Sequence, residues 1–80
     1  MPDDARLSAV LLEWLDAVYR LNREGQASIA RLSRRLHVDE GIARTRVREL
    51  QGLGLVRSEA PGRLVPTAEG ERIALGLLRR

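Results

Sequence analysis

Cysteine is absent from this chain of 80 residues, and so is any long uninterrupted apolar run. Without thiols, no disulfide can brace the fold, and no thiolate can bind a metal or act as a nucleophile. The longest apolar stretch, residues 7–21, is broken by Glu13, Asp16 and Arg20, so it is neither a signal peptide nor a membrane span. We therefore expect a soluble, cytoplasmic protein with no membrane partner, folded as one domain over residues 1–80.

Catalytic motifs are missing as well. No nucleophile is paired with a base, no glycine-rich loop could cradle a phosphate, and no ligand spacing suits zinc. His37 is the only histidine and has no catalytic partner. The aromatic residues are Trp14 and Tyr19, which lie in an apolar helical repeat and are expected in the core rather than on a base-stacking surface. We expect neither enzymatic activity nor a cofactor.

Charge is plentiful and unevenly spread. Residues 1–27 hold three arginines against five acidic residues, a net −2, whereas residues 28–66 hold eight arginines against four acidic residues, a net +4. All 14 basic residues are arginine. This usage suits bidentate contacts with phosphate or guanine, although codon bias in a GC-rich genome would produce the same usage.

Apolar spacing in this basic middle of the chain predicts two helices joined by a tight turn. Leu32 and Leu36 lie one turn apart on the first of these helices, and His37-Val38-Asp39 supplies the connection. The second helix has apolar residues at i, i+4 and i+7, namely Ala43, Val47 and Leu50. This is helix-turn-helix spacing.

The residues that follow predict a hairpin. The second helix exits through Gly54 into Leu55-Val56, and the turn Ala60-Pro61-Gly62 reverses the chain into Leu64-Val65. A short extended piece over residues 26–29 could add a third strand. The expected fold is therefore a mainly α winged helix-turn-helix, with four helices and a wing sheet of two to three strands.

Helix boundaries follow from caps and periodicity. The first helix is expected from Asp4, in the start signal Pro2-Asp3-Asp4, to Arg23. Its apolar repeat consists of Leu7, Val10, Leu11, Trp14, Leu15, Val18 and Leu21. The other helices are expected over residues 30–37, over residues 40–53 with Asp39 as N-cap, and after Thr67 as N-cap. The last helix has an apolar face of Ile73, Ala74, Leu77 and Leu78.

Four segments in this order resemble the N-terminal DNA-binding domain of the iron-dependent and manganese-dependent repressors, the diphtheria toxin repressor type. The segments are WLDAVYRL, LSRRLHV, the L-x-x-L-G-L-V exit of the third helix, and LVPTAEGERIA at the end of the wing. Multiple-antibiotic-resistance-type regulators share the winged core and the T-x-x-G ending. The resemblance implies a DNA-binding domain without the family's metal-binding and dimerisation domain.

The resemblance also implies where a metal would bind. Family members use an acidic pair on the first helix together with histidine and acidic residues just beyond the fourth helix. Glu13 and Asp16 fall at the acidic-pair positions, but the rest of that site is missing, and His37 lies in the turn before the third helix. Two carboxylates alone bind transition metals poorly. Glu13 and Asp16 are thus weak metal candidates, and an ordinary solvated acidic edge is the alternative.

The third helix is the candidate recognition helix. Arg44, Thr45 and Arg48 lie opposite its apolar positions, and Gly41 lies at the end expected to be close to DNA. Arginine can read guanine O6 and N7, and threonine can touch a thymine methyl or a phosphate. Arg46 falls nearer the flank and is a weaker candidate. The simpler alternative is a solvated charged face on a structural helix.

Contacts with the DNA backbone are predicted from two other places. Arg31, Arg34 and Arg35 on the second helix and Arg63 in the wing are candidates for phosphate contacts, which set the register without reading sequence. Each of them alone could equally be a surface residue that favours solubility.

Two functions of different classes are compatible with these patterns. The first is a sequence-specific DNA-binding transcriptional regulator, most simply a repressor, whose partner is double-stranded DNA. The second is a winged-helix protein-interaction adaptor without DNA binding, which the acidic residues Asp39, Glu40 and Glu49 around the third helix keep open. The distribution of charge favours the regulator.

A homodimer through the first and fourth helices is also predicted. Regulators of this type dimerise to span half-sites about one helical turn apart. Several leucine and valine positions spread beyond a single apolar stripe on these two helices: Val10, Leu12 and Leu21 on the first, and Leu75, Leu77 and Leu78 on the fourth. An uncovered apolar patch marks a partner surface.

Overall fold

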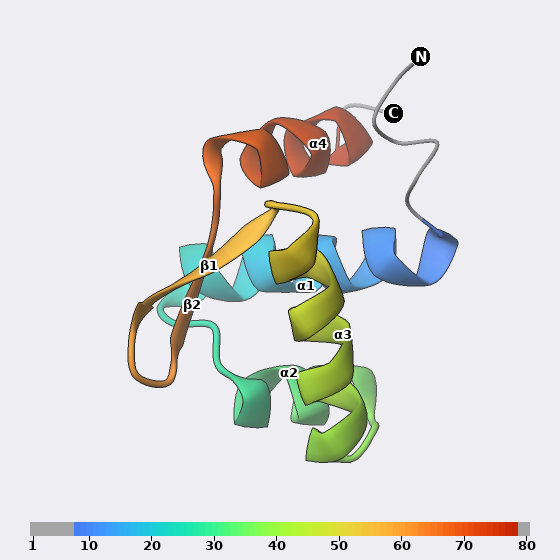
Figure 1. Ribbon diagram of the computed structural model, residues 1–80, viewed down its shortest axis with the longest axis vertical. Coiled ribbons are helices and arrows are strands. Elements are labelled where there is room, and N and C mark those ends of the chain that lie inside the picture. The colour runs from blue at the N-terminus through green and yellow to red at the C-terminus, as the bar shows by residue number, and fades with distance from the viewer. Residues whose placement is uncertain (1–7, 79–80) are drawn as a thin grey trace.

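The computed structural model describes residues 8–78, with side chains as far as Gly76. Its elements are α1 (Ala9–Glu24), α2 (Ile29–Leu36), α3 (Glu40–Gly52), β1 (Val56–Ala60), β2 (Arg63–Pro66) and α4 (Ala68–Leu78). In Figure 1, α1 crosses the middle of the molecule, α4 lies on one side of it, α2 and α3 lie on the other, and the hairpin projects at the edge. Within the described range, no helix has the length and apolar character to cross a bilayer.

The helix-turn-helix is held by side-chain and backbone caps. Ser28 begins α2 by accepting a hydrogen bond from the Arg31 backbone N–H at 3.2 Å. The helix ends at His37, which adopts the left-handed conformation with φ 58°, and the Val38 N–H donates to the Ser33 carbonyl at 3.1 Å. Asp39 then caps α3 by accepting from the Ile42 N–H at 3.0 Å, as predicted. The predicted bounds of α2 and α3 are each within one residue of those observed.

The exit of α3 has the same geometry with glycine in the left-handed position. Gly54 has φ 75°, its N–H donates to the Gln51 carbonyl, and the Leu55 N–H donates to the Leu50 carbonyl, both at 3.0 Å. This pair of bonds is the Schellman arrangement, and it is accompanied by burial of the two leucines. The chain is thereby turned into β1 at a fixed angle.

The T-x-x-G sequence, Thr67 to Gly70, connects the start of α4 to the residues that follow α3. The Thr67 hydroxyl donates to the Gly54 carbonyl at 2.7 Å and accepts from the Gly70 N–H at 3.1 Å, which confirms Thr67 as the cap. The Thr67 N–H donates to the Leu55 carbonyl at 3.0 Å. A Cβ atom built on Gly70 would lie 2.0 Å from that Leu55 oxygen, so only glycine fits this approach of backbone to backbone. We call the contacts of Gly54, Leu55, Thr67 and Gly70 the α4 clasp.

The wing is an antiparallel hairpin of two strands. Val56 pairs with Pro66, Arg57 with Val65 and Ser58 with Leu64, and the register shifts between Ser58 and Ala60. The predicted third strand is reduced to one isolated bridge, in which the Leu64 N–H donates to the Ala27 carbonyl at 2.9 Å. Ser28 has to cap α2 immediately afterwards, so the extended segment is too short to add further rungs.

The core lies where all the helices meet the base of the wing. Leu15 and Val18 of α1, Leu32 of α2 and Leu50 of α3 are fully buried. The core also takes in Trp14 and Tyr19, so the prediction of a core position for both aromatic residues is confirmed. The predicted apolar faces of α3 and α4 are buried at Ala43, Val47, Leu50, Ile73 and Ala74.

The predicted start of α1 is wrong. The helix does not run through Ser8, because Ser8 is extended (φ −73°, ψ 162°) and caps α1 by accepting from the Leu11 N–H at 3.1 Å. Serine is among the best N-caps, which accounts for a helix start at Ala9. The predicted start signal Pro2-Asp3-Asp4 and Leu7 lie outside the described range. Val10 is 44% exposed, in agreement with its predicted place beyond a single apolar stripe.

Candidate nucleic-acid interface

The side of α3 directly opposite the core carries one line of mostly small residues. Opposite the buried positions, a stripe of exposed residues follows the helix: Gly41, Thr45, Arg48 and Gly52. Three of these four residues are small, so the backbone of α3 could approach a partner closely. Arg48 is the only long side chain on the stripe.

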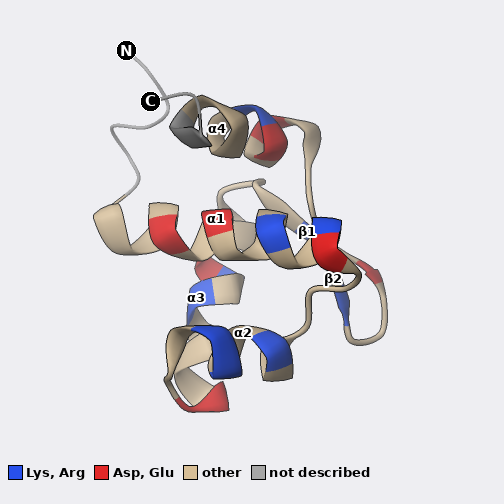
Figure 2. Cartoon of the chain, turned by 180° about the vertical axis from the view of Figure 1, so that it is seen from behind, with Lys and Arg blue, Asp and Glu red and all other residues tan. Residues whose placement is uncertain are grey.

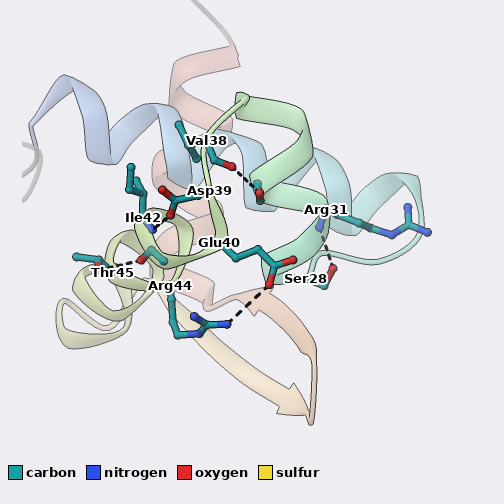
Figure 3. Close-up of polar contacts among 10 residues, drawn as sticks. Ser28, Arg31, Val38, Asp39, Glu40, Ile42, Arg44 and Thr45 are labelled. Atoms are coloured by element: carbon teal, nitrogen blue, oxygen red, sulfur yellow. Dashed lines mark hydrogen bonds and ion pairs between the residues drawn. The ribbon is translucent and has the colours of Figure 1, made fainter.

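Some polar side chains on and beside this stripe already form hydrogen bonds or ion pairs within the protein, and others do not. The Thr45 hydroxyl donates to the Gly41 carbonyl at 3.1 Å, and Arg44 lies 3.8 Å from the Glu40 carboxylate (Figure 3). Within residues 8–78, Arg48 has no hydrogen bond or ion pair. Of the predicted base-reading residues, Arg48 is therefore the one with all its donors available.

The acidic residues near α3 are occupied by internal contacts. Asp39 caps the helix, and Glu49 accepts from Arg46 at 2.9 Å. Glu40 faces Arg44. These exposed pairs contribute little stability, but they offset negative charge that would otherwise repel an anionic partner. Arg46 lies on the flank of α3, as predicted, and is half-buried.

Sequence reasoning missed Ile42. Its side chain is 44% exposed in the first turn of α3, beside Asp39 and Thr45 in Figure 3. The i, i+4, i+7 pattern that starts at Ala43 already excludes position 42 from the core face, so the helical periodicity contained the signal. An exposed isoleucine at this end of α3 adds an apolar contact to the candidate interface.

The wing carries two exposed arginines, of which sequence reasoning found one. Arg63 lies 3.6 Å from the Glu59 carboxylate. Arg57 was not singled out, although its side chain is exposed and it has no polar partner among the described residues. In the hairpin register Arg57 is opposite Val65. Burial does not alternate along β1 after Val56, so strand periodicity gave no signal for Arg57.

The three arginines of α2 lie together in a different place. Arg31, Arg34 and Arg35 line an open hollow with Leu21 and Glu24 of α1. Figure 2 shows α1 and α2 from behind, with α3 on their far side, and in Figure 3 the Arg31 side chain extends away from Arg44. The structure thus separates the predicted DNA-binding residues into an α3–wing group and an α1–α2 group. The phosphate contacts predicted for the second group stay a prediction.

In the described residues, the acidic pair Glu13 and Asp16 of α1 is not joined by further side chains that could bind a metal ion. Glu13 is exposed, and the Asp16 carboxylate accepts from Arg20 Nε at 2.9 Å. His37 lies in the turn between α2 and α3. Among the residues that the structure describes, no group of three or more histidine and acidic side chains is arranged to hold a metal ion.

Comparison with known proteins identifies the fold. No family model and no curated protein sequence matches the chain. Among solved structures, the multiple antibiotic-resistance repressor (MarR) of Listeria monocytogenes superposes with a TM-score of 0.74 at 26% identity over 86% of this chain. T. acidophilum IdeR superposes with a TM-score of 0.79 at 28% identity over 85% of this chain. The chain has a winged helix-turn-helix fold.

This winged helix-turn-helix chain covers only part of each neighbour, 48% of the MarR chain and 32% of the IdeR chain. The two neighbours match to a similar degree, so the similarity places the chain beside transcriptional repressors without singling out the diphtheria toxin repressor type.

Proposed function

We propose that this chain is a DNA-binding module of a transcriptional repressor, with α3 in the major groove and the wing against the backbone. The observation that carries the proposal is the outward stripe of mostly small residues on α3, with the unpaired Arg48 within it. The unpaired Arg57 and the nearby Arg63 place positive charge on the adjoining wing. Structural similarity to the MarR repressor supports the same function.

The three candidate base-reading side chains suit different groups in the groove. Arg48 can donate two hydrogen bonds to guanine O6 and N7. Because the Thr45 hydroxyl donates its hydrogen to the Gly41 carbonyl, it can only accept from a base, while its methyl group and Ile42 offer apolar contacts. The apolar group in the major groove is the thymine methyl. We therefore propose a half-site that combines a guanine with at least one thymine.

Binding to duplexes selected from a random pool tests this function. Anisotropy titrations should give an association constant that falls linearly with salt on a log–log plot, with a slope of about −0.9 per phosphate contacted. Replacing the critical thymine by uracil should weaken binding about fourfold, because one buried methyl group is lost. If no duplex is enriched and binding does not depend on salt, the DNA-binding function is wrong.

The alternative function is a protein-interaction adaptor, and exposed Ile42 is the observation that favours it. An apolar side chain on the α3 face would suit a protein groove as well as a thymine methyl. Partner binding driven by Ile42 would depend weakly on salt, whereas binding to phosphates depends on it steeply. The same salt series therefore separates the two functions.

We further propose that two copies associate through α1 and α4. Val10 on α1 and Leu75 on α4 are exposed, the latter by 37%, and the two helices pack against each other. The predicted contribution of Leu21 is wrong, because Leu21 is buried at the contact of α1 with the rest of the core, and Leu12 is half-buried there. The side chains of Leu77 and Leu78 lie outside the described part.

Sedimentation equilibrium of the parent and of Val10→Glu tests the dimer. The parent should associate at micromolar concentration, and the variant should be monomeric with an unchanged helical circular-dichroism signal. A parent that stays monomeric at high micromolar concentration would remove the dimer from the proposal.

A further inference from the structure

The hollow between α1 and α2 gathers positive charge on a side of the molecule that the proposed function does not use. It has a volume of about 400 Å³ and is lined by Leu21, Glu24, Arg31, Arg34 and Arg35. A second open hollow of about 390 Å³ shares Glu24 and is lined also by Tyr19, Arg20 and Arg23. Both hollows are open to solvent, so a ligand there would be held by the charged side chains instead of by enclosure.

Charge around the first hollow is only partly compensated. Glu24 lies 2.6 Å from Arg35 Nη2 and forms an ion pair with it. Within residues 8–78, the side chains of Arg31 and Arg34 have no hydrogen bond or ion pair. The hydrogen bond of Arg31 to the Ser28 cap is donated by its backbone N–H. Arginines at i, i+3 and i+4 repel one another. An anion seated among them would relieve that repulsion.

The chemistry of the lining specifies the class of anion. Guanidinium groups present paired donors that match phosphate oxygens, and charge-assisted bonds of this kind are among the stronger hydrogen bonds in proteins. Two free arginines and a third shared with Glu24 suit a ligand that carries at least two negative charges. Leu21 also lines the hollow, but it is only 5% exposed and offers little apolar surface.

The position of the hollow separates it from the α3 face. Arg31 extends away from Arg44 and the α3 residues in Figure 3, and Figure 2 shows α2 on the near side when α3 is on the far side. A duplex seated on α3 and the wing would therefore leave the hollow accessible. Through Leu32, which is fully buried, α2 packs into the same core as α3.

We propose that this hollow is a binding site for a small phosphate-bearing anion, with Arg31 and Arg34 as donors and with Glu24 competing for Arg35. The site is separate from the DNA face. Its ligand class is a diphosphate or a doubly charged phosphate ester rather than the backbone of nucleic acid.

Calorimetric titration with inorganic pyrophosphate at constant ionic strength tests the site. The parent should bind one pyrophosphate saturably, and Arg34→Ala should weaken binding at least tenfold. Arg57→Ala is the matched control, since it removes the same charge from an unpaired arginine in the wing, and it should change the affinity less than twofold. Absence of saturable binding, or equal weakening by the two variants, would overturn the proposal.

A second variant should change the affinity for pyrophosphate in the opposite direction. Glu24→Gln removes the carboxylate that competes for Arg35, so pyrophosphate should bind severalfold more tightly. Weaker binding in this variant, with an unchanged thermal unfolding curve, would mean that Glu24 positions Arg35 instead of competing for it and would contradict the proposed geometry.

A competition experiment distinguishes a small phosphate ligand from a phosphate of the DNA backbone. Pyrophosphate is titrated at constant ionic strength into the complex with a labelled duplex, and the duplex should stay bound. Displacement from the parent but not from Arg34→Ala would mean that the hollow holds a DNA phosphate, which would overturn the proposal. The calorimetric titration needs no DNA. It therefore tests the anion site even if the chain proves not to bind DNA.

Discussion

The two ends of α3 are built in different ways. The N-terminal end is held by one side-chain cap, Asp39, and leaves Ile42 and Thr45 exposed. At the C-terminal end, the α4 clasp brings Gly70 against the Leu55 carbonyl with no room for another atom. Substitutions should therefore be tolerated by the fold at the first end and change what the surface binds. At the second end, they should change stability.

The largest expected effect is that of Gly70→Ala at the clasp. The added Cβ would meet a backbone carbonyl that cannot move without shifting α4, so we expect a loss of about 3 kcal/mol or more in the free energy of unfolding. Gly76→Ala is the control on the same helix, because its Cβ would enter open space, and it should stabilise by up to about 1 kcal/mol. Chemical denaturation measures both. Similar values for the two variants would remove the clasp as the cause.

At the exposed face, Arg48→Ala should leave the fold unchanged and weaken DNA binding. If Arg48 reads a guanine, the loss should be about 1–3 kcal/mol of specific binding energy, with relaxed preference at one base pair. Arg63→Ala should weaken binding to all sequences alike, because a phosphate contact carries no sequence information. Anisotropy titrations that give parental affinity for both variants would show that the assigned DNA face is wrong.

Thr67→Ala should have an intermediate effect on stability. It removes the hydroxyl that bonds both the Gly54 carbonyl and the Gly70 N–H, so we expect a loss of about 1–2 kcal/mol in thermal or chemical unfolding. Thr67→Ser retains the hydroxyl and should recover most of that loss. Equal destabilisation by the two variants would assign the effect to the Thr67 methyl group instead of the clasp bonds.

The smallest expected effect is a gain in stability from a substitution at the C-terminal end of α2. His37 occupies the same left-handed position that Gly54 occupies at the exit of α3, and only glycine does so without strain. His37→Gly should therefore stabilise the protein by about 0.5–1 kcal/mol, whereas His37→Ala should give no gain because it keeps the Cβ atom. Loss of stability in His37→Gly would indicate that the imidazole makes a contact that outweighs the strain.

Local signals allowed much of the fold to be predicted. The caps at Asp39 and Thr67, the turn Ala60-Pro61-Gly62 and the buried positions of α3 each depend on residues within a few positions of one another. Ser8 shows the limit of such signals, because α1 was predicted from Asp4 and the structure has its N-cap at Ser8.

Predictions about the site were less complete for a physical reason. The periodicity of α3 correctly placed Arg44, Thr45 and Arg48 on the outside, but exposure alone does not reveal which arginine is free. Arg48 and Arg57 stand out only when the ion pairs of their neighbours are known, and such pairs depend on side-chain conformation.

The sequence by itself determined the order of the helices, the turn between α2 and α3, and the composition of the core, because hydrogen bonds between near neighbours and apolar periodicity act along the chain. Only the tertiary structure decided that Gly70 has no room for a side chain, and that the arginines of α2 face Glu24 of α1 instead of joining the α3 surface. These outcomes depend on the distances between segments that are far apart in the sequence, and packing of the whole core sets those distances.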